Sequence, residues 1–385
     1  MQASNVCTPT WGHIGTIFVA LELGQRSWLV TVHSPERDKI SRHTVSGGNY
    51  VGLLALIERE RERSTRALGA SPAVASCYEA GYDGFWLHRL LTAAGITNHV
   101  FDPASIAVEQ RARRVKTDRI DGELLLRTLM AHCRGEPRVV RIVRVPGPEQ
   151  EDARRATRER DRLIKEQGAH INRIKALLRL LGFPVGNPRR RGWLTWLAAQ
   201  RDWQGRAVPP HTLAEIRREY ARLMLVREQL AALEERPEQA QFTPAAEMTR
   251  RRDHLSRLKG LGPAFSGTLS HEVFYKDFRN RRQVAAYLGL APSPWQSGRT
   301  SRQQGISKAG NPRARRAAIE LAWLWLRHQP DSALTQWFHA RAVNASKRIK
   351  RIAIVALARK LMVALWRYLT TGLVPEGAVL KPVKA

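Results

Sequence analysis

The chain is poor in cysteine, with Cys7, Cys77 and Cys133 as the only three among 385 residues. Three cysteines cannot all pair with one another, and their spacing matches no arrangement of metal ligands. This excludes a small secreted scaffold held by disulfides and a cysteine-ligated zinc module. The simple prediction is a protein that works in a reducing cytoplasm.

Long apolar runs are also absent. The most apolar stretch, from Ile352 to Leu369, is interrupted by Arg359, Lys360 and Arg367, so we do not expect it to span a bilayer. No signal peptide opens the sequence. We therefore expect a cytoplasmic protein that has no membrane partner.

Acidic residues are few compared with basic ones. The chain has 34 Asp and Glu against 64 Lys and Arg, which gives a formal net charge of +30 and a pI of about 11.3. Such a balance is untypical of an enzyme for small neutral substrates, and it favours nucleic acid first and an anionic membrane second. Residues 1–100 carry a net charge of only +1, whereas residues 246–385 carry +19. We expect a nearly neutral folded core at the start and a polyanion-binding surface in the remainder.

The first part of the chain, residues 14–135, is predicted to be an α/β domain because strands alternate with helices. Strands are expected at residues 16–23, 28–32, 73–79 and 97–101, with a helix at 83–94. Glu22 and Glu79 fall at or near strand ends, which is where α/β sheets place their active sites.

Two further carboxylates stand in a basic run. Asp118 and Asp121 are three residues apart at the start of a predicted helix, so they project from one face. Carboxylates embedded in a basic surface are what a divalent cation needs if it is to meet a phosphodiester. The alternative is an ordinary solvated helix start, in which the two acids complement the helix dipole. The basic neighbours are Arg113, Arg114, Lys116 and Arg119.

The middle of the chain, residues 149–235, is predicted to form two long helices. Ile164, Ile171 and Leu178 repeat every seven residues, as in a coiled coil. The pattern fits both a packed hairpin within one chain and dimerisation between chains. The loop between the helices carries three tryptophans beside arginines, and a small satellite core is favoured over a base-stacking surface. These tryptophans are Trp193, Trp196 and Trp203.

The third part, residues 248–370, is expected to be mostly α-helical. Lys259, Gly260 and Gly262 form a stretch that resembles a helix-hairpin-helix turn, whose backbone N–H groups can approach a phosphate. The same glycines could simply end one helix and begin the next. Residues 291–312 are rich in Pro, Ser and Gly and are expected to form a loop. The two closing helices, 313–328 and 346–369, carry apolar stripes that are most simply core: Trp323, Trp325, Ile352, Val355, Leu361 and Leu365.

Six short motifs follow one another along the chain. With these motifs in this order, the chain resembles the DEDD transposases of the insertion-sequence family "IS one-ten", in particular its "IS eleven-eleven" branch. The resemblance extends over almost the whole length. It implies a RuvC-like domain of RNase H fold at 14–135, a coiled coil or hairpin that serves oligomerisation at 149–235, and a transposase domain at 248–370. The motifs are Val19–Leu23, Tyr78–Gly81, Lys116–Asp121, Tyr287–Pro292, Gln296–Gly298 and Gly305–Asn311.

The resemblance also implies a catalytic set. Its acidic tetrad falls on Glu22, Glu79, Asp118 and Asp121, with glutamate at the first position where the family usually has aspartate. These carboxylates would hold Mg²⁺, and the serine before Gly298, Ser297, would be the nucleophile that forms a covalent protein–DNA intermediate. The metal site, Arg299 or Lys308 could activate this serine, and the sequence does not choose among them.

The resemblance further implies a DNA recombinase of a bacterial mobile element. Its partners would be the element ends and target DNA, an element-encoded non-coding bridge RNA, and further copies of the chain in a dimer or tetramer near the nucleoid. Two alternatives stay open: a RuvC-like nuclease or junction resolvase that uses water, and a non-catalytic nucleic-acid-binding relic disabled by Glu22. The predicted nucleic-acid-binding residues are Arg113, Arg114, Lys116, Arg119, Lys259, Gly260, Gly262, Arg299, Arg302, Lys308 and Arg313.

Overall fold

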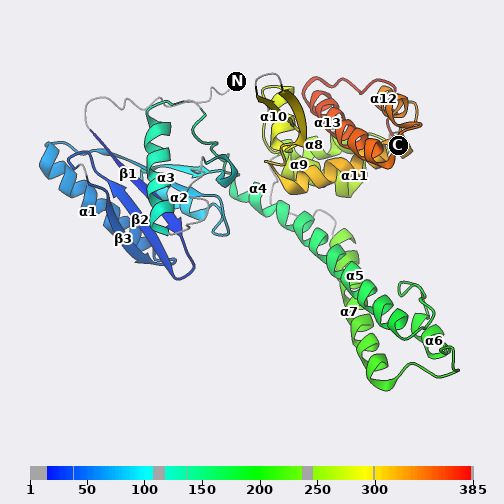
Figure 1. Cartoon of the computed structure of the whole chain (residues 1–385). Coiled ribbons are helices and arrows are strands. Elements are labelled where there is room, and N and C mark those ends of the chain that lie inside the picture. The colour runs from blue at the N-terminus through cyan, green and yellow to red at the C-terminus, as the bar shows by residue number, and fades with distance from the viewer. Residues whose placement is uncertain are drawn as a thin grey trace. The chain divides into compact units, whose positions relative to one another are not determined.

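The chain folds into two compact units, residues 1–146 and 147–385 (Figure 1). The structure, a computed structural model, describes residues 15–37, 39–106, 118–136, 138–235, 246–297 and 300–382. Within these ranges the side chains of residues 118–120, 234–235, 246, 300 and 302–303 are not part of the description.

The first unit is built on a five-stranded mixed sheet with the strand order β3-β2-β1-β4-β5. β1 pairs antiparallel with β2 and parallel with β4. β3 pairs antiparallel with β2, and β5 pairs parallel with β4. The strands are β1 (Thr16–Leu23), β2 (Ser27–His33), β3 (Ser41–Ser46), β4 (Ala73–Glu79) and β5 (Thr97–Phe101). The α/β prediction for this part of the chain is confirmed.

Helices cover both faces of this sheet (Figure 1). α1 (Tyr50–Leu68) and α2 (Trp86–Ala93) share one apolar core with alternate residues of β1, such as Val19 and Leu21. α3 (Asp118–Cys133) packs on the other face, against the intervening residue Ala20 and against Cys77 of β4. The alternation of side chains along a strand therefore divides this unit into two cores. A short 3-10 helix, η1 (Pro103–Ser105), follows β5.

The second unit begins with α4 (Pro148–Asp152) and the long helix α5 (Arg154–Leu180). α5 packs along α7 (Pro210–Glu235), and α6 (Trp193–Ala198) lies in the connection between them (Figure 1). The predicted satellite core includes buried Trp193 and partly buried Trp196. Trp203 does not belong to it, because 82% of its surface is exposed.

The rest of this unit is a helical domain with one β-hairpin. Its elements are α8 (Ala246–Ser256), α9 (Pro263–Glu272), α10 (Arg281–Tyr287), β6 (Pro292–Ser297), β7 (Thr300–Ile306), α11 (Pro312–His328), α12 (Ala333–Ala342) and α13 (Lys347–Thr371). The mostly helical prediction is confirmed. The expectation of a loop at 291–312 is wrong, since most of this segment is the β6–β7 hairpin.

The expected core stripes of the last helices need a correction. Trp325, Leu361 and Leu365 are fully buried, but Trp323 and Ile352 are 50% and 60% exposed. Trp323 lies two residues from Trp325, which on a helix is nearly the opposite face. Within the described ranges, no helix is long and apolar enough to cross a membrane.

Candidate functional site

Two carboxylates lie side by side at one edge of the five-stranded sheet. Parallel pairing sets Leu21 of β1 opposite Tyr78 of β4, so Glu22 and Glu79 follow as the next pair in register. Ala20 and Cys77, two residues earlier on each strand, face α3. Because side chains alternate along strands, Glu22 and Glu79 are on that same face. Neighbouring strands are about 5 Å apart, which is within reach of a shared ligand.

The first turns of α3 pass close to this edge. A Cβ built on Gly122 would lie 2.6 Å from Thr31 Oγ1 and 3.5 Å from Leu29 Cδ2, so only glycine permits the approach. Leu29 is the antiparallel partner of Glu22. Asp121, in the first turn of α3, therefore lies near the strand end that carries Glu22, and it is half-buried. An ion pair between Arg42 of β3 and Glu123 further ties this end of α3 to the sheet.

The face beneath α3 is apolar next to the carboxylates. Cys77 Sγ lies 3.7 Å from the Leu125 carbonyl oxygen. Burial raises the pKa of the Cys77 thiol well above its ordinary value, and Cys133 and the carboxylate of Glu79 raise it further. Burial therefore favours the protonated form of this thiol. The acidic edge thus offers oxygen ligands and lies beside the buried core between the sheet and α3.

The acidic edge does not form a complete metal cage among the described residues. No group of three or more His, Cys, Asp or Glu side chains that could hold a metal ion occurs there. The backbone of Asp118 begins α3, but its side chain and that of Arg119 are not described. Arg113, Arg114 and Lys116 also lie outside the described residues.

Ser297 lies in the second unit, on the β6–β7 hairpin. It is the last residue of β6, pairs with Thr300 and is exposed. It therefore stands at the end of the hairpin where β6 ends and β7 begins. Residues 298–299, including Arg299, and the side chain of Arg302 lie outside the description.

The base of this hairpin is closed by backbone hydrogen bonds. Ser307 N donates to Ala291 O at 2.8 Å, and Lys308 N donates to Gly289 O at 3.1 Å. Lys308 has a φ of +55°, which is uncommon for a residue with a side chain, and Arg315 Nη1 donates to its carbonyl oxygen at 2.9 Å. Below these contacts Asn311 N donates to Tyr287 O at 2.8 Å.

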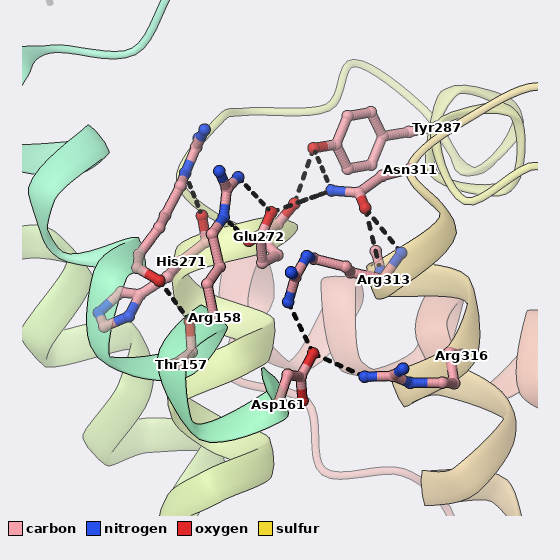
Figure 2. A network of polar contacts seen from close by, with 11 residues as sticks. Thr157, Arg158, Asp161, His271, Glu272, Tyr287, Asn311, Arg313 and Arg316 are labelled. Carbon is pink, nitrogen blue, oxygen red and sulfur yellow. Dashed lines mark hydrogen bonds and ion pairs between the residues drawn. The ribbon is translucent and has the colours of Figure 1, made fainter. Parts of the chain in front are cut away.

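A buried carboxylate lies under the hairpin base (Figure 2). Glu272, at the end of α9, is 2% exposed. Arg158 of α5 binds it through two N–H groups, at 2.8 and 3.4 Å, and Asn311 Nδ2 donates to it at 3.1 Å. Tyr287 Oη donates to the Glu272 carbonyl oxygen at 2.7 Å. Four elements, α5, α9, α10 and α11, therefore meet at one group of polar side chains.

A second ion-pair group continues this network along α5. Asp161 Oδ2 accepts from Arg313 Nη1 at 2.7 Å and from Arg316 Nη2 at 2.6 Å (Figure 2). Arg313 is thus engaged in holding α11 to α5, and we leave it out of the proposed DNA contacts. Sequence reasoning missed this network because its members are far apart in the chain. The one local signal was Asn311-Pro312, in which Asn311 caps α11.

The predicted turn at Lys259, Gly260 and Gly262 joins α8 to α9, as expected. Gly260 has a φ of +91°, and a Cβ there would lie 2.8 Å from His328 Cβ. Lys381 Nζ donates to the carbonyl oxygens of Ser256 and Leu261, at 2.7 Å each. The C-terminal segment therefore covers part of this turn, while the side chain of Lys259 is exposed.

Comparison with known proteins shows that the chain is similar to transposases. It is 47% identical to "Putative transposase y4rJ" of Sinorhizobium fredii over 96% of this chain and 95% of that protein. It is 30% identical to "Putative transposase y4qE" of the same organism, over 71% of this chain and 63% of that protein. It is 26% identical to the "Transposase for insertion sequence element IS1111A" of Coxiella burnetii, over 74% of each. Residues 252–336, which include the hairpin and Glu272, match the family described as "Transposase IS116/IS110/IS902 family".

These relatives define the class as transposases, enzymes that cut and rejoin DNA. Within this class, the chain belongs to the IS110/IS116 family of insertion-sequence transposases.

Proposed function

We propose that this transposase cuts and rejoins DNA strands through a covalent bond between Ser297 and DNA, with a carboxylate tetrad at the acidic edge. The observation that carries the proposal is the parallel pairing of β1 with β4 up to Leu21 and Tyr78, which sets Glu22 and Glu79 at adjacent strand ends. The strand order, with three antiparallel strands followed by two parallel ones, supports a RuvC-like fold for residues 14–135. Residues 149–235 would then serve oligomerisation, and residues 248–370 would form the transposase domain.

The donor set fits Mg²⁺ as the cofactor. Glu22, Glu79, Asp118 and Asp121 offer only oxygen ligands, which Mg²⁺ prefers. When bound, the metal would neutralise charge on the phosphoryl oxygens. Glu22, one methylene longer than aspartate, can still bind the ion.

Ser297 supplies the nucleophile in this proposal. Its Oγ attacks the scissile phosphorus, the bond from phosphorus to the leaving strand oxygen breaks, and that oxygen takes up a proton. The seryl–phosphodiester conserves the bond energy, so the hydroxyl of another strand can reverse the step and rejoin DNA. The exposed position at the end of β6 leaves Ser297 accessible to a strand.

Two partners belong to the same proposal. The acidic edge and Ser297 lie in different units, so they would meet within one chain or across protomers of a dimer or tetramer. The net charge of +30 is compatible with an element-encoded bridge RNA bound together with DNA.

The test is a cleavage assay with Mg²⁺, element-end DNA and the flanking transcript, analysed on denaturing protein gels. Wild type and Ser293→Ala, a control on the same strand, are expected to give a protein–DNA adduct, and Ser297→Ala none. Cut DNA without an adduct, equal in all three proteins, would instead indicate a RuvC-like nuclease that uses water. Omission of the transcript tests the RNA requirement separately.

The proposed carboxylate tetrad can be tested by substituting one of its members. Asp118→Asn should abolish strand cleavage and leave DNA affinity nearly unchanged, because affinity depends on basic groups. Asp83→Asn in the same unit is the matched control and should cleave normally. Cleavage at the wild-type rate by Asp118→Asn would remove this residue from the metal site.

A further inference from the structure

Two helices of the second unit, α12 and α13, carry positive charge without any acidic residue of their own. Between Asp331 and Glu376 the chain contains no Asp or Glu. The segment covers α12 and α13 and includes eight cations, which are Arg341, Lys347, Arg348, Lys350, Arg351, Arg359, Lys360 and Arg367. This is a local excess on one pair of helices, beyond the basic balance of the whole protein.

These cations differ from other arginines of the same unit in their partners. On α5, α7 and α8, Arg162, Arg222 and Arg250 each pair with a glutamate of their own helix. In the part of the chain that the structure describes, none of the eight cations on α12 and α13 forms an ion pair. Their charge is therefore not neutralised within the fold and is available to an external anion.

The start of α13 extends beyond the core of its domain. Ile354 is buried, but the residues three, four and seven positions before it, on the same helical face, are Arg351, Lys350 and Lys347, and all three are exposed. On the outer side Ile349 and Ile352 are 48% and 60% exposed. Residues 347–352 at the start of α13 are thus all exposed, and burial begins at Ala353.

The positive charge at the start of α13 also destabilises this helix end when no anion is bound. The first turn of α13 has no acidic residue, and Ser346 caps it by accepting from Ile349 N at 3.4 Å. Cations next to the positive end of a helix dipole repel it, whereas an anion there is stabilised. A bound row of phosphates would remove the repulsion between Lys347, Arg348 and the helix end.

Two more cations of α12 and α13 lie on one aromatic ring. Arg341 and Lys360 stand over the ring of Trp337, at 4.5 and 4.8 Å from its centroid. Both cations are exposed. The ring restricts their positions, so a ligand that contacts them loses less side-chain entropy than it would with free lysines and arginines.

We propose that this α12–α13 surface, defined as Arg341, Lys347, Arg348, Lys350, Arg351 and Lys360, binds the phosphate backbone of duplex DNA. A projecting helix end with cations and two isoleucines fits the major groove of B-form DNA, which admits a helix. The deep, narrow major groove of duplex RNA does not admit one. Among the described residues at this end, the exposed large apolar side chains are Val343, Ile349 and Ile352, an apolar area that is small for a membrane surface.

The test compares two triple variants of the full-length chain that lose the same charge. Lys347→Gln, Lys350→Gln and Arg351→Gln are combined in one protein. The control combines Arg162→Gln, Arg222→Gln and Arg250→Gln, whose arginines are paired within their own helices. Fluorescence anisotropy measures binding to an element-end duplex across a salt series, and circular dichroism verifies that the variants fold.

The α13 variant should bind the duplex about tenfold more weakly near 0.1 M salt. Its slope of log affinity against log salt should fall by about 2 to 3, since each phosphate contact contributes about 0.9. The control should keep the wild-type slope. A charge-preserving variant (Lys347→Arg, Lys350→Arg, Arg351→Lys) should bind like wild type.

Equal losses in the α13 variant and the control would overturn the proposal, because they would reflect net charge and not this surface. So would unchanged duplex affinity together with weaker binding of the folded flanking transcript, which would assign the surface to RNA. Ser297→Ala should bind the duplex like wild type in either case, so the nucleophile proposal and this one fail independently.

Discussion

Glu272 keeps its charge although the fold removes it from water. Burial by itself raises the pKa of this carboxyl, but the hydrogen bonds and charge of Arg158, together with Asn311, hold the pKa below its ordinary value. Arg154, whose Nε donates to His271 O at 3.1 Å, adds to this effect. The carboxylate is thereby stable only while α5 and α11 stay in contact with the end of α9.

Glu272→Gln should therefore lower the free energy of unfolding by about 1–3 kcal/mol at pH 7, since Arg158 loses its charged partner. A depressed carboxyl pKa contributes stability above the unfolded pKa of about 4.3, and this is lost as pH falls through the lower folded pKa. The difference between wild type and variant should thus shrink below about pH 4.

Urea denaturation at several pH values measures this difference. Glu320→Gln is a suitable control, because Glu320 is exposed and 3.7 Å from Arg316. An equal effect of both substitutions would contradict a special role of the buried carboxylate.

At the scale of elements, the β6–β7 hairpin depends on the close approach of α10 and the segment before α11. A Cβ on Gly310 would lie 2.7 Å from Gly289 N and would also clash with the carbonyl oxygen of Tyr287. Backbone atoms cannot move aside as the end of a flexible side chain can. The glycine is therefore required by packing at the base of the hairpin.

Gly310→Ala should displace the hairpin base and reduce adduct formation at least tenfold, with loss of roughly 1–3 kcal/mol of stability. Gly168→Ala on α5 is the matched control: nothing lies within 4 Å of its new Cβ, so it should gain about 0.5–1 kcal/mol. Thermal melting and the adduct gel measure both effects. Normal adduct yield in Gly310→Ala would mean that the base of the hairpin does not position Ser297.

Local signals predicted some elements and missed others. Helices that begin at a capping residue, such as α11 at Asn311 and α13 at Ser346, were located to within a residue or two. β3 was missed because its alternating residues are mostly polar, and α1 was missed because charged residues dominate its second half. The β6–β7 hairpin was missed because Pro, Ser and Gly indicate a loop unless strand pairing is known.

At the scale of the whole molecule, the two units have separate cores. Leu21 is fully buried in the core of the first unit, and Leu361 is fully buried in that of the second. The residues of one core do not occur in the other. Each core should therefore be able to melt separately.

Scanning calorimetry should show two transitions. Leu21→Ala should lower the midpoint temperature of one transition, and Leu361→Ala that of the other. Each substitution should reduce the free energy of unfolding of its own unit by about 2–5 kcal/mol. A single transition, lowered alike by both substitutions, would mean that the units unfold together.

The sequence by itself determined the fold class, the basic character and the family, because strand and helix periodicities, charge counts and short motifs are all local properties. It also located the carboxylates and the serine that the proposed chemistry needs. Only the tertiary structure brought the strand ends that carry Glu22 and Glu79 next to each other, since strand pairing joins residues far apart in the chain. The same holds for Arg158, Glu272 and Asn311, whose contacts arise only when α5, α9 and α11 pack. The exposed start of α13 likewise follows from where the core ends, which no local pattern records.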